Sequence, residues 1–153
     1  DLRWEPERTE DPALHARFAD DLAFSVPRGV DFVPANENLH FASVLALHRA
    51  TRALQVADTL LYVRLPGPLR RWKPDVVRLH PTLRRVLQPR PGAAAEFRAW
   101  CDALRALARQ ADTLCAAHSG VLRPGQGAPL AERVAAAIDA VAGVVERHER
   151  RHG

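Results

Sequence analysis

The chain has 153 residues, of which 47% are hydrophobic and 26% are charged, and its formal net charge is +4. This composition excludes an intrinsically disordered chain, and the length suits one domain with its own core. No apolar run is long enough to cross a membrane, and the acidic start from Asp1 to Asp11 is unlike a signal peptide. We therefore predict an intracellular protein without a membrane span, while a leader removed before residue 1 stays an alternative.

Residue usage is strongly biased. Arginine supplies all but one of the 22 basic residues, Lys73 being the exception, and methionine is absent. Such a preference is typical of a GC-rich genome, either bacterial or that of a DNA virus. It indicates nothing about activity.

Two helices are predicted in the first half of the chain. Asp11 followed by Pro12 is typical of a helix start, and Leu14, Phe18 and Leu22 continue it with a four-residue spacing. From residue 38 to residue 63 there is neither glycine nor proline, and the apolar residues fall on two helical faces. This pattern predicts a long central helix with neighbours on both sides.

A short helix is expected from Val76 to Val86, beginning or kinked at Pro81, because proline removes a backbone donor. The most regular spacing follows, from Phe97 to His118 and again from Leu130 to His152. Two such helices joined by a short loop pack antiparallel.

The predicted alignment of this hairpin places His148 opposite Trp100 and His152 opposite Glu96. The residues expected to be buried between the helices are Leu104, Leu107, Val134 and Val141. The predicted fold class is therefore all-α: residues 1–153 form a single helical domain, a compact bundle of about four to five helices with a C-terminal antiparallel helical hairpin.

The two cysteines, Cys101 and Cys115, fall on one predicted helix. Their separation would be roughly 21 Å at 1.5 Å per residue. A disulfide needs Cα atoms within about 7 Å, so both thiols are expected to be reduced. Free thiols favour a reducing compartment.

Charge is unevenly distributed along the chain. Residues 1–38 contain 4 basic and 9 acidic residues, whereas residues 64–90 contain 8 basic and 1 acidic residue. Arginine beside an aromatic ring suits both carboxylate and phosphate recognition. The candidate binding residues are Arg64, Arg70, Arg71, Trp72, Lys73, Arg78, Arg84, Arg85 and Arg90.

From this basic segment we predict a non-enzymatic helical domain for protein–protein interaction or scaffolding, with no cofactor and no catalytic residue. One alternative is that the same segment binds a polyanion, either nucleic acid or phosphate. Another is that its arginines are solvated or paired with the acidic N-terminal residues. Salt separates the first two interpretations, because phosphate binding weakens steeply as salt rises.

A further alternative is a metal site at the end of the hairpin. His148 and His152 have the HExxH spacing, in which two histidines one helical turn apart share a face and can hold zinc. Glu96 and Cys101 would lie nearby in the predicted alignment. Cationic side chains also favour a helix C-terminus without any metal, since they complement its dipole.

Two other groups of polar residues could carry chemistry. Cys115 and His118 would share a face of the predicted helix and could form a thiolate–imidazole pair, although a buried thiol and a hydrogen-bonded histidine explain the spacing as well. His40, His48, Thr51 and Asp58 would lie on the long helix, where they could line a ligand cavity or form local hydrogen bonds in the core.

The run from Leu47 to Leu54 resembles the His- and Arg-bearing helix of polyphosphate-binding CHAD domains. The spacing between histidine and arginine differs, and no second matching half follows. The resemblance implies a helix that binds polyphosphate.

Overall fold

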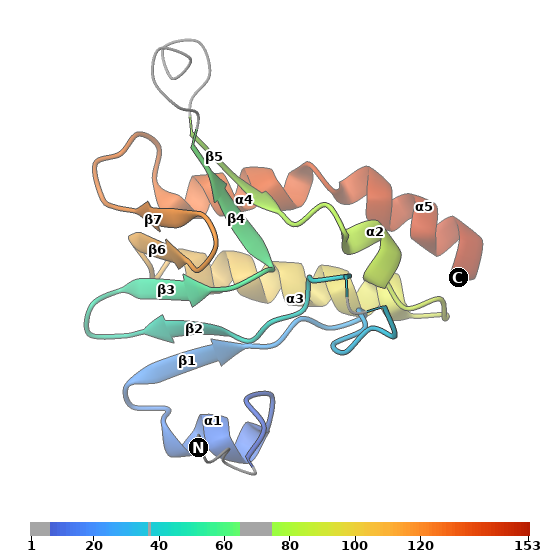
Figure 1. Ribbon diagram of the computed structural model, residues 1–153, viewed down its shortest axis with the longest axis horizontal. Helices are drawn as coiled ribbons and strands as arrows, with labels where there is room; N and C mark the ends of the chain where they lie inside the picture. The colour runs from blue at the N-terminus through green and yellow to red at the C-terminus, as the bar shows by residue number, and fades with distance from the viewer. Residues whose placement is uncertain (1–6, 37, 65–74) are drawn as a thin grey trace.

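The computed structural model describes residues 7–36, 38–64 and 75–153, and over these ranges the chain is a mixed α/β protein (Figure 1). The described residues form seven strands in two sheets, one five-stranded with the order β1-β2-β3-β6-β7 and one two-stranded, β4-β5. The prediction of an all-α bundle is therefore wrong. None of the helices in these ranges is long and apolar enough to span a membrane.

The N-terminal helix is shorter than expected. α1 (Pro12–Arg17) begins as predicted, because the Asp11 carboxylate accepts a hydrogen bond from the Ala13 amide at 2.8 Å. It ends before the predicted boundary, and the chain enters β1 (Leu22–Ser25), an edge strand of the larger sheet. The His15 ring stacks on Phe24 with 4.5 Å between ring centroids and so holds α1 on β1.

The predicted long helix over residues 38–63 is replaced by three strands, β2 (Leu45–His48), β3 (Ala53–Val56) and β4 (Leu60–Val63). Buried and less buried residues alternate along each of them, which is the two-residue period of a strand. The turn between β2 and β3 needs no glycine, because Arg52 itself adopts a left-handed φ of 53°. The resemblance to a CHAD helix therefore falls on a β-hairpin and is not supported.

The second half of the larger sheet is reached through a helix. α3 (Ala93–Ala108) leads to β6 (Thr113–Ala116), which pairs parallel with β3, and β7 (Gly120–Leu122) returns antiparallel beside β6. The helix predicted to continue to His118 thus ends ten residues earlier, at Ala108. Cys115 consequently lies on a strand and Cys101 on a helix, and both are free thiols.

The smaller sheet pairs β4 with β5 (Val76–Leu79) in antiparallel fashion. The expected helix from Val76 to Val86 is confined to one turn, α2 (Leu83–Val86), because β5 occupies the first part of that range and Pro81 follows it. α4 (Leu130–Asp139) packs against β5. The β4–β5 pair is thus held on the helical side of the molecule (Figure 1).

The core lies between the larger sheet and the helices α3, α4 and α5 (Ala142–His152). Leu104, Leu107 and Val134 are buried as predicted, and Val141 is partly buried against the same cluster. α3 runs antiparallel to α4 and α5, as Figure 1 shows, but the predicted hairpin of two continuous helices is wrong: the first helix ends at Ala108, and the second is divided into α4 and α5. The β6–β7 hairpin, which lies between α3 and α4 in the chain, was not predicted.

Candidate functional site

The described part of the basic segment is spread over several elements. Arg64 follows β4, Arg78 lies on β5, and Arg84 and Arg85 lie on α2. All of these side chains are exposed, as is that of Arg90 after α2. The remaining predicted members, Arg70, Arg71, Trp72 and Lys73, lie outside the described residues.

α2 is fixed by its apolar side. Leu83 and Val86 are buried in the core, so the intervening Arg84 and Arg85 point away from it. α2 packs against α5, and the His148 ring hydrogen-bonds through Nε2 to the Gln88 carbonyl oxygen at 2.8 Å. The segment that carries these arginines is therefore tied to the C-terminal helix.

α5 brings further positive charge to this region. Its last turn contains Arg150 and Arg151, and Arg147 lies one turn before, all three exposed. We call Arg84, Arg85, Arg147, Arg150 and Arg151 the α2–α5 surface. The α5 arginines were not part of the predicted site, although they form a visible basic run near the end of the sequence. Only the fold shows that this run lies beside α2.

Arg90 is the one described arginine of the basic segment with an ion pair. Its guanidinium donates to both Glu96 oxygens at 2.9 and 2.6 Å, and this pairing raises the pKa of Arg90 and lowers the pKa of Glu96. Two of the described N-terminal acids pair locally instead, Glu7 with Arg17 and Glu10 with Arg8. Within the described ranges, no ion pair joins the basic segment to the acidic N-terminal residues.

The four candidate metal ligands do not converge. Glu96 is held by Arg90, and His148 is bonded to Gln88. The His148 and His152 rings do lie close together, with 4.6 Å between their centroids. Among the described residues, no group of three or more potential ligands could hold a metal ion.

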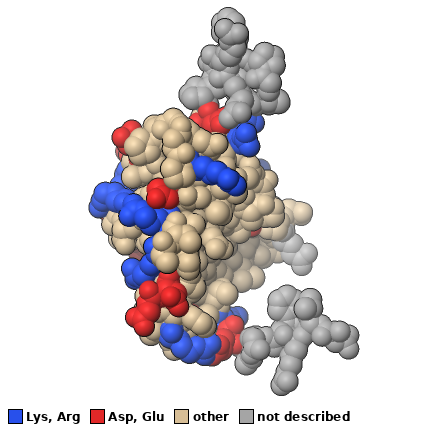
Figure 2. All heavy atoms as spheres, turned by 90° about the vertical axis from the view of Figure 1, so that its left-hand side faces the viewer, with Lys and Arg blue, Asp and Glu red and all other residues tan. Residues whose placement is uncertain are grey.

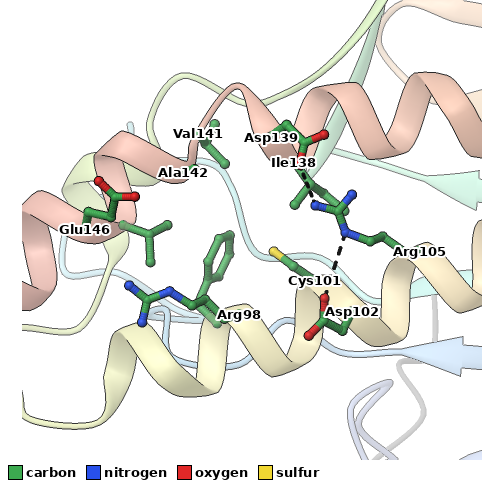
Figure 3. A pocket seen from close by; sticks show the side chains of 11 residues that line it. Arg98, Cys101, Asp102, Arg105, Ile138, Asp139, Val141, Ala142 and Glu146 are labelled. Atoms are coloured by element: carbon green, nitrogen blue, oxygen red, sulfur yellow. Dashed lines mark hydrogen bonds and ion pairs between the residues drawn. The ribbon is translucent and has the colours of Figure 1, made fainter.

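Cys101 lies instead in a pocket between α3 and the α4–α5 side, with a volume of about 280 Å³ (Figure 3). Burial raises the pKa of this thiol to about 12, so it stays protonated at neutral pH. Figure 3 shows Arg105 between Asp102 and Asp139, and its guanidinium lies 2.7 Å from the Asp139 carboxylate. The pocket therefore has an apolar floor and an ion-paired rim, and its thiol is not an activated nucleophile.

The other polar groups are also separated. Cys115 lies on β6, whereas His118 lies in the following turn with Nε2 at 3.4 Å from the Asp58 carboxylate. The His48 ring bonds to the Thr51 hydroxyl at 2.7 Å, within the β2–β3 turn. The predicted thiolate–imidazole pair is not assembled, because Cys115 lies on a strand and His118 in the turn after it. Of the predicted polar cluster, His40 and Asp58 each act electrostatically on His80, whereas the His48 ring is engaged by Thr51.

The arrangement thus offers exposed guanidinium groups on packed helices rather than an assembled set of acid, base and nucleophile. Such groups bind carboxylates or phosphates in two-point contacts. Comparisons of the chain with protein-family models, with curated proteins and with solved structures find no match.

Proposed function

We propose that this chain is a non-catalytic interaction domain that binds an acidic segment of a partner protein through the α2–α5 surface. The observation that carries the proposal is the packing of α2, which carries Arg84 and Arg85, against α5, whose second half carries Arg147, Arg150 and Arg151. Two basic runs that lie far apart in the sequence thereby become neighbours. The combined positive charge of these arginines is complementary to an acidic partner.

The charges of the α2–α5 surface are not neutralised within the described part of the chain. No hydrogen bond or ion pair joins the side chains of its five arginines to another described residue. Glu149 lies on α5 among them, but it is occupied by Arg98 of α3 at 2.6 Å. The guanidinium groups are therefore available for carboxylates from outside.

A protein partner is favoured over nucleic acid by the neighbouring side chains. Binding of single-stranded nucleic acid relies on aromatic rings that stack on the bases. In the described part of this surface, the only rings are those of His148 and His152, which are tilted against each other by 42° and are partly buried. The net charge of the whole chain, +4, is also modest for a protein dedicated to nucleic acid.

The proposal is tested by fluorescence anisotropy with two labelled probes of matched length, an Asp/Glu-rich peptide and a single-stranded oligonucleotide. We expect the peptide to bind more tightly at physiological salt. If the oligonucleotide binds more tightly, with an affinity that falls steeply as salt rises, the surface is a polyanion site. If neither probe binds, the proposal is wrong.

A further inference from the structure

A second basic site lies at the opposite end of the larger sheet, around a cavity of about 350 Å³. Three arginines from different elements line it: Arg52 from the β2–β3 turn, Arg109 from the end of α3, and Arg123 from the loop after β7. Figure 2 faces this end of the molecule and shows groups of basic side chains with acidic ones between them. The site shares no residue with the α2–α5 surface.

Among the described residues, only one carboxylate lines the cavity, and it is already engaged. Asp112 accepts from Arg52 Nε at 3.1 Å through one oxygen and from the Thr113 hydroxyl at 3.0 Å through the other. The side chains of Arg109 and Arg123 have no hydrogen bond or ion pair with any residue in the described ranges. The described lining thus contains three guanidinium groups and one carboxylate, which leaves two positive charges without a counterion in the part of the chain that the structure describes.

The wall that carries Arg123 is held in place by its own bonds. The Arg123 amide donates to the Gln126 side-chain oxygen at 2.9 Å, and the Arg133 guanidinium donates to the carbonyl oxygens of Gln126 and Ala128. Gly127 has a φ of 86°, a left-handed backbone conformation that glycine adopts more readily than other residues. These hydrogen bonds therefore fix the loop that carries Arg123.

Arg52, on the other side of the cavity, is also held by a backbone hydrogen bond. Its carbonyl oxygen accepts from the Asp112 amide at 3.0 Å, which ties the β2–β3 turn to the start of β6. Its left-handed φ of 53° is an uncommon conformation for a residue with a side chain. The backbone thus holds Arg52 beside Asp112 at the rim.

We propose that this cavity binds the phosphoryl group of a small ligand. Two uncompensated guanidinium charges match a dianionic phosphoryl group, and guanidinium forks bind its oxygens in two-point contacts. The volume is within the lower range of small-molecule sites. Leu122 and Leu130 line the same cavity and are buried, so they give an apolar contact for the rest of the ligand.

Isothermal titration calorimetry at constant ionic strength tests this site with inorganic phosphate, pyrophosphate and acetate. We expect one phosphate or pyrophosphate per chain, and acetate at least about tenfold weaker, because a single carboxylate carries less charge. The double variant Arg109→Gln/Arg123→Gln should bind pyrophosphate at least about tenfold more weakly. The variant Arg28→Gln removes an exposed charge elsewhere and should bind as the wild type does.

Amide NMR spectra locate the binding independently and show that each variant is folded. Pyrophosphate should shift the Gly125 and Gly127 amide signals in the wild type and leave them unshifted in the double variant. Equal pyrophosphate affinity of wild type and double variant would overturn the proposal. So would acetate binding as tight as that of phosphate, or an equal loss in Arg28→Gln.

Discussion

The Arg98 guanidinium donates to both oxygens of Glu149, at 2.8 and 2.6 Å, and so connects α3 to α5. The predicted antiparallel alignment placed Glu149 opposite Ala99, one position from the residue that it contacts. At this pair the predicted alignment is therefore wrong by one position, and the metal site inferred from it is not assembled. Glu149, the acidic residue of the HExxH pattern, forms an ion pair between the two helices.

This ion pair has a pH-dependent contribution to stability. The hydrogen bond from Arg98 lowers the pKa of Glu149 below its ordinary value of 4.5. The contribution is therefore complete above about pH 4.5 and is lost as the pH falls through the lowered pKa. In calorimetry at pH 7, Glu149→Gln should melt slightly below the wild type, because both side chains are substantially exposed. Equal differences at pH 7 and near pH 2 would contradict this.

The packing of α3 on the sheet predicts a large effect for Leu104. Its side chain has no exposed surface, and Leu104→Ala should lower the free energy of unfolding by about 2–5 kcal/mol in urea denaturation. Val121 lies on the uncovered side of β7 with 37% of its surface exposed, so Val121→Ala should cost less than about 1 kcal/mol. Similar values for the two variants would mean that α3 packs differently.

Gly29 lies against the start of α3, where a Cβ atom would be 2.1 Å from the Ala93 carbonyl oxygen, and its φ is 70°. Gly29→Ala should therefore destabilise the fold by more than about 2 kcal/mol, combining a clash with a strained backbone. Gly125 has a similar φ of 78° and open space around it, so Gly125→Ala isolates the backbone cost of about 1–2 kcal/mol. If thermal unfolding shows equal losses of stability for Gly29→Ala and Gly125→Ala, the close contact of Gly29 with Ala93 does not contribute, and the prediction is wrong.

Thr59 is a fully buried polar residue between β3 and β4. Its hydroxyl donates to the Phe41 carbonyl at 2.8 Å and lies 2.9 Å from the Ser43 hydroxyl. Thr59→Val should cost about 1–3 kcal/mol, since buried partners lose their hydrogen bond, whereas Thr59→Ser should keep it. If chemical denaturation shows that Thr59→Ser is less stable than Thr59→Val, the hydrogen-bond assignment is wrong.

The sequence predicted the C-terminal helices and missed the sheet, and the reason is visible in particular residues. Leu45, Leu47, Leu54 and Val56 alternate with less buried residues over only four positions in each strand, and leucine and alanine at these positions also satisfy a helical spacing. The β2–β3 turn carries no glycine or proline to mark it, because Arg52 takes the left-handed conformation. Short strands joined by such turns are hard to distinguish from one long helix.

The candidate sites were predictable to different extents. The clustering of arginine in residues 64–90 is a property of the sequence and needs no fold. The contact between α2 and α5, and the meeting of Arg52, Arg109 and Arg123, join residues from separate elements. No spacing along the chain could indicate them, because they depend on how the sheet and helices pack.

The most direct test of the proposed function is the affinity of the acidic peptide for Arg84→Glu/Arg85→Glu, compared with Arg8→Glu/Arg49→Glu, which makes the same charge change at exposed residues elsewhere. We predict that the first variant loses binding by at least about a hundredfold, that the second retains it, and that the melting temperature of the first hardly changes, since exposed charges contribute little to folding. Equal affinities of the two variants for the peptide, or a loss of binding that accompanies a loss of fold, would contradict the assignment of the α2–α5 surface.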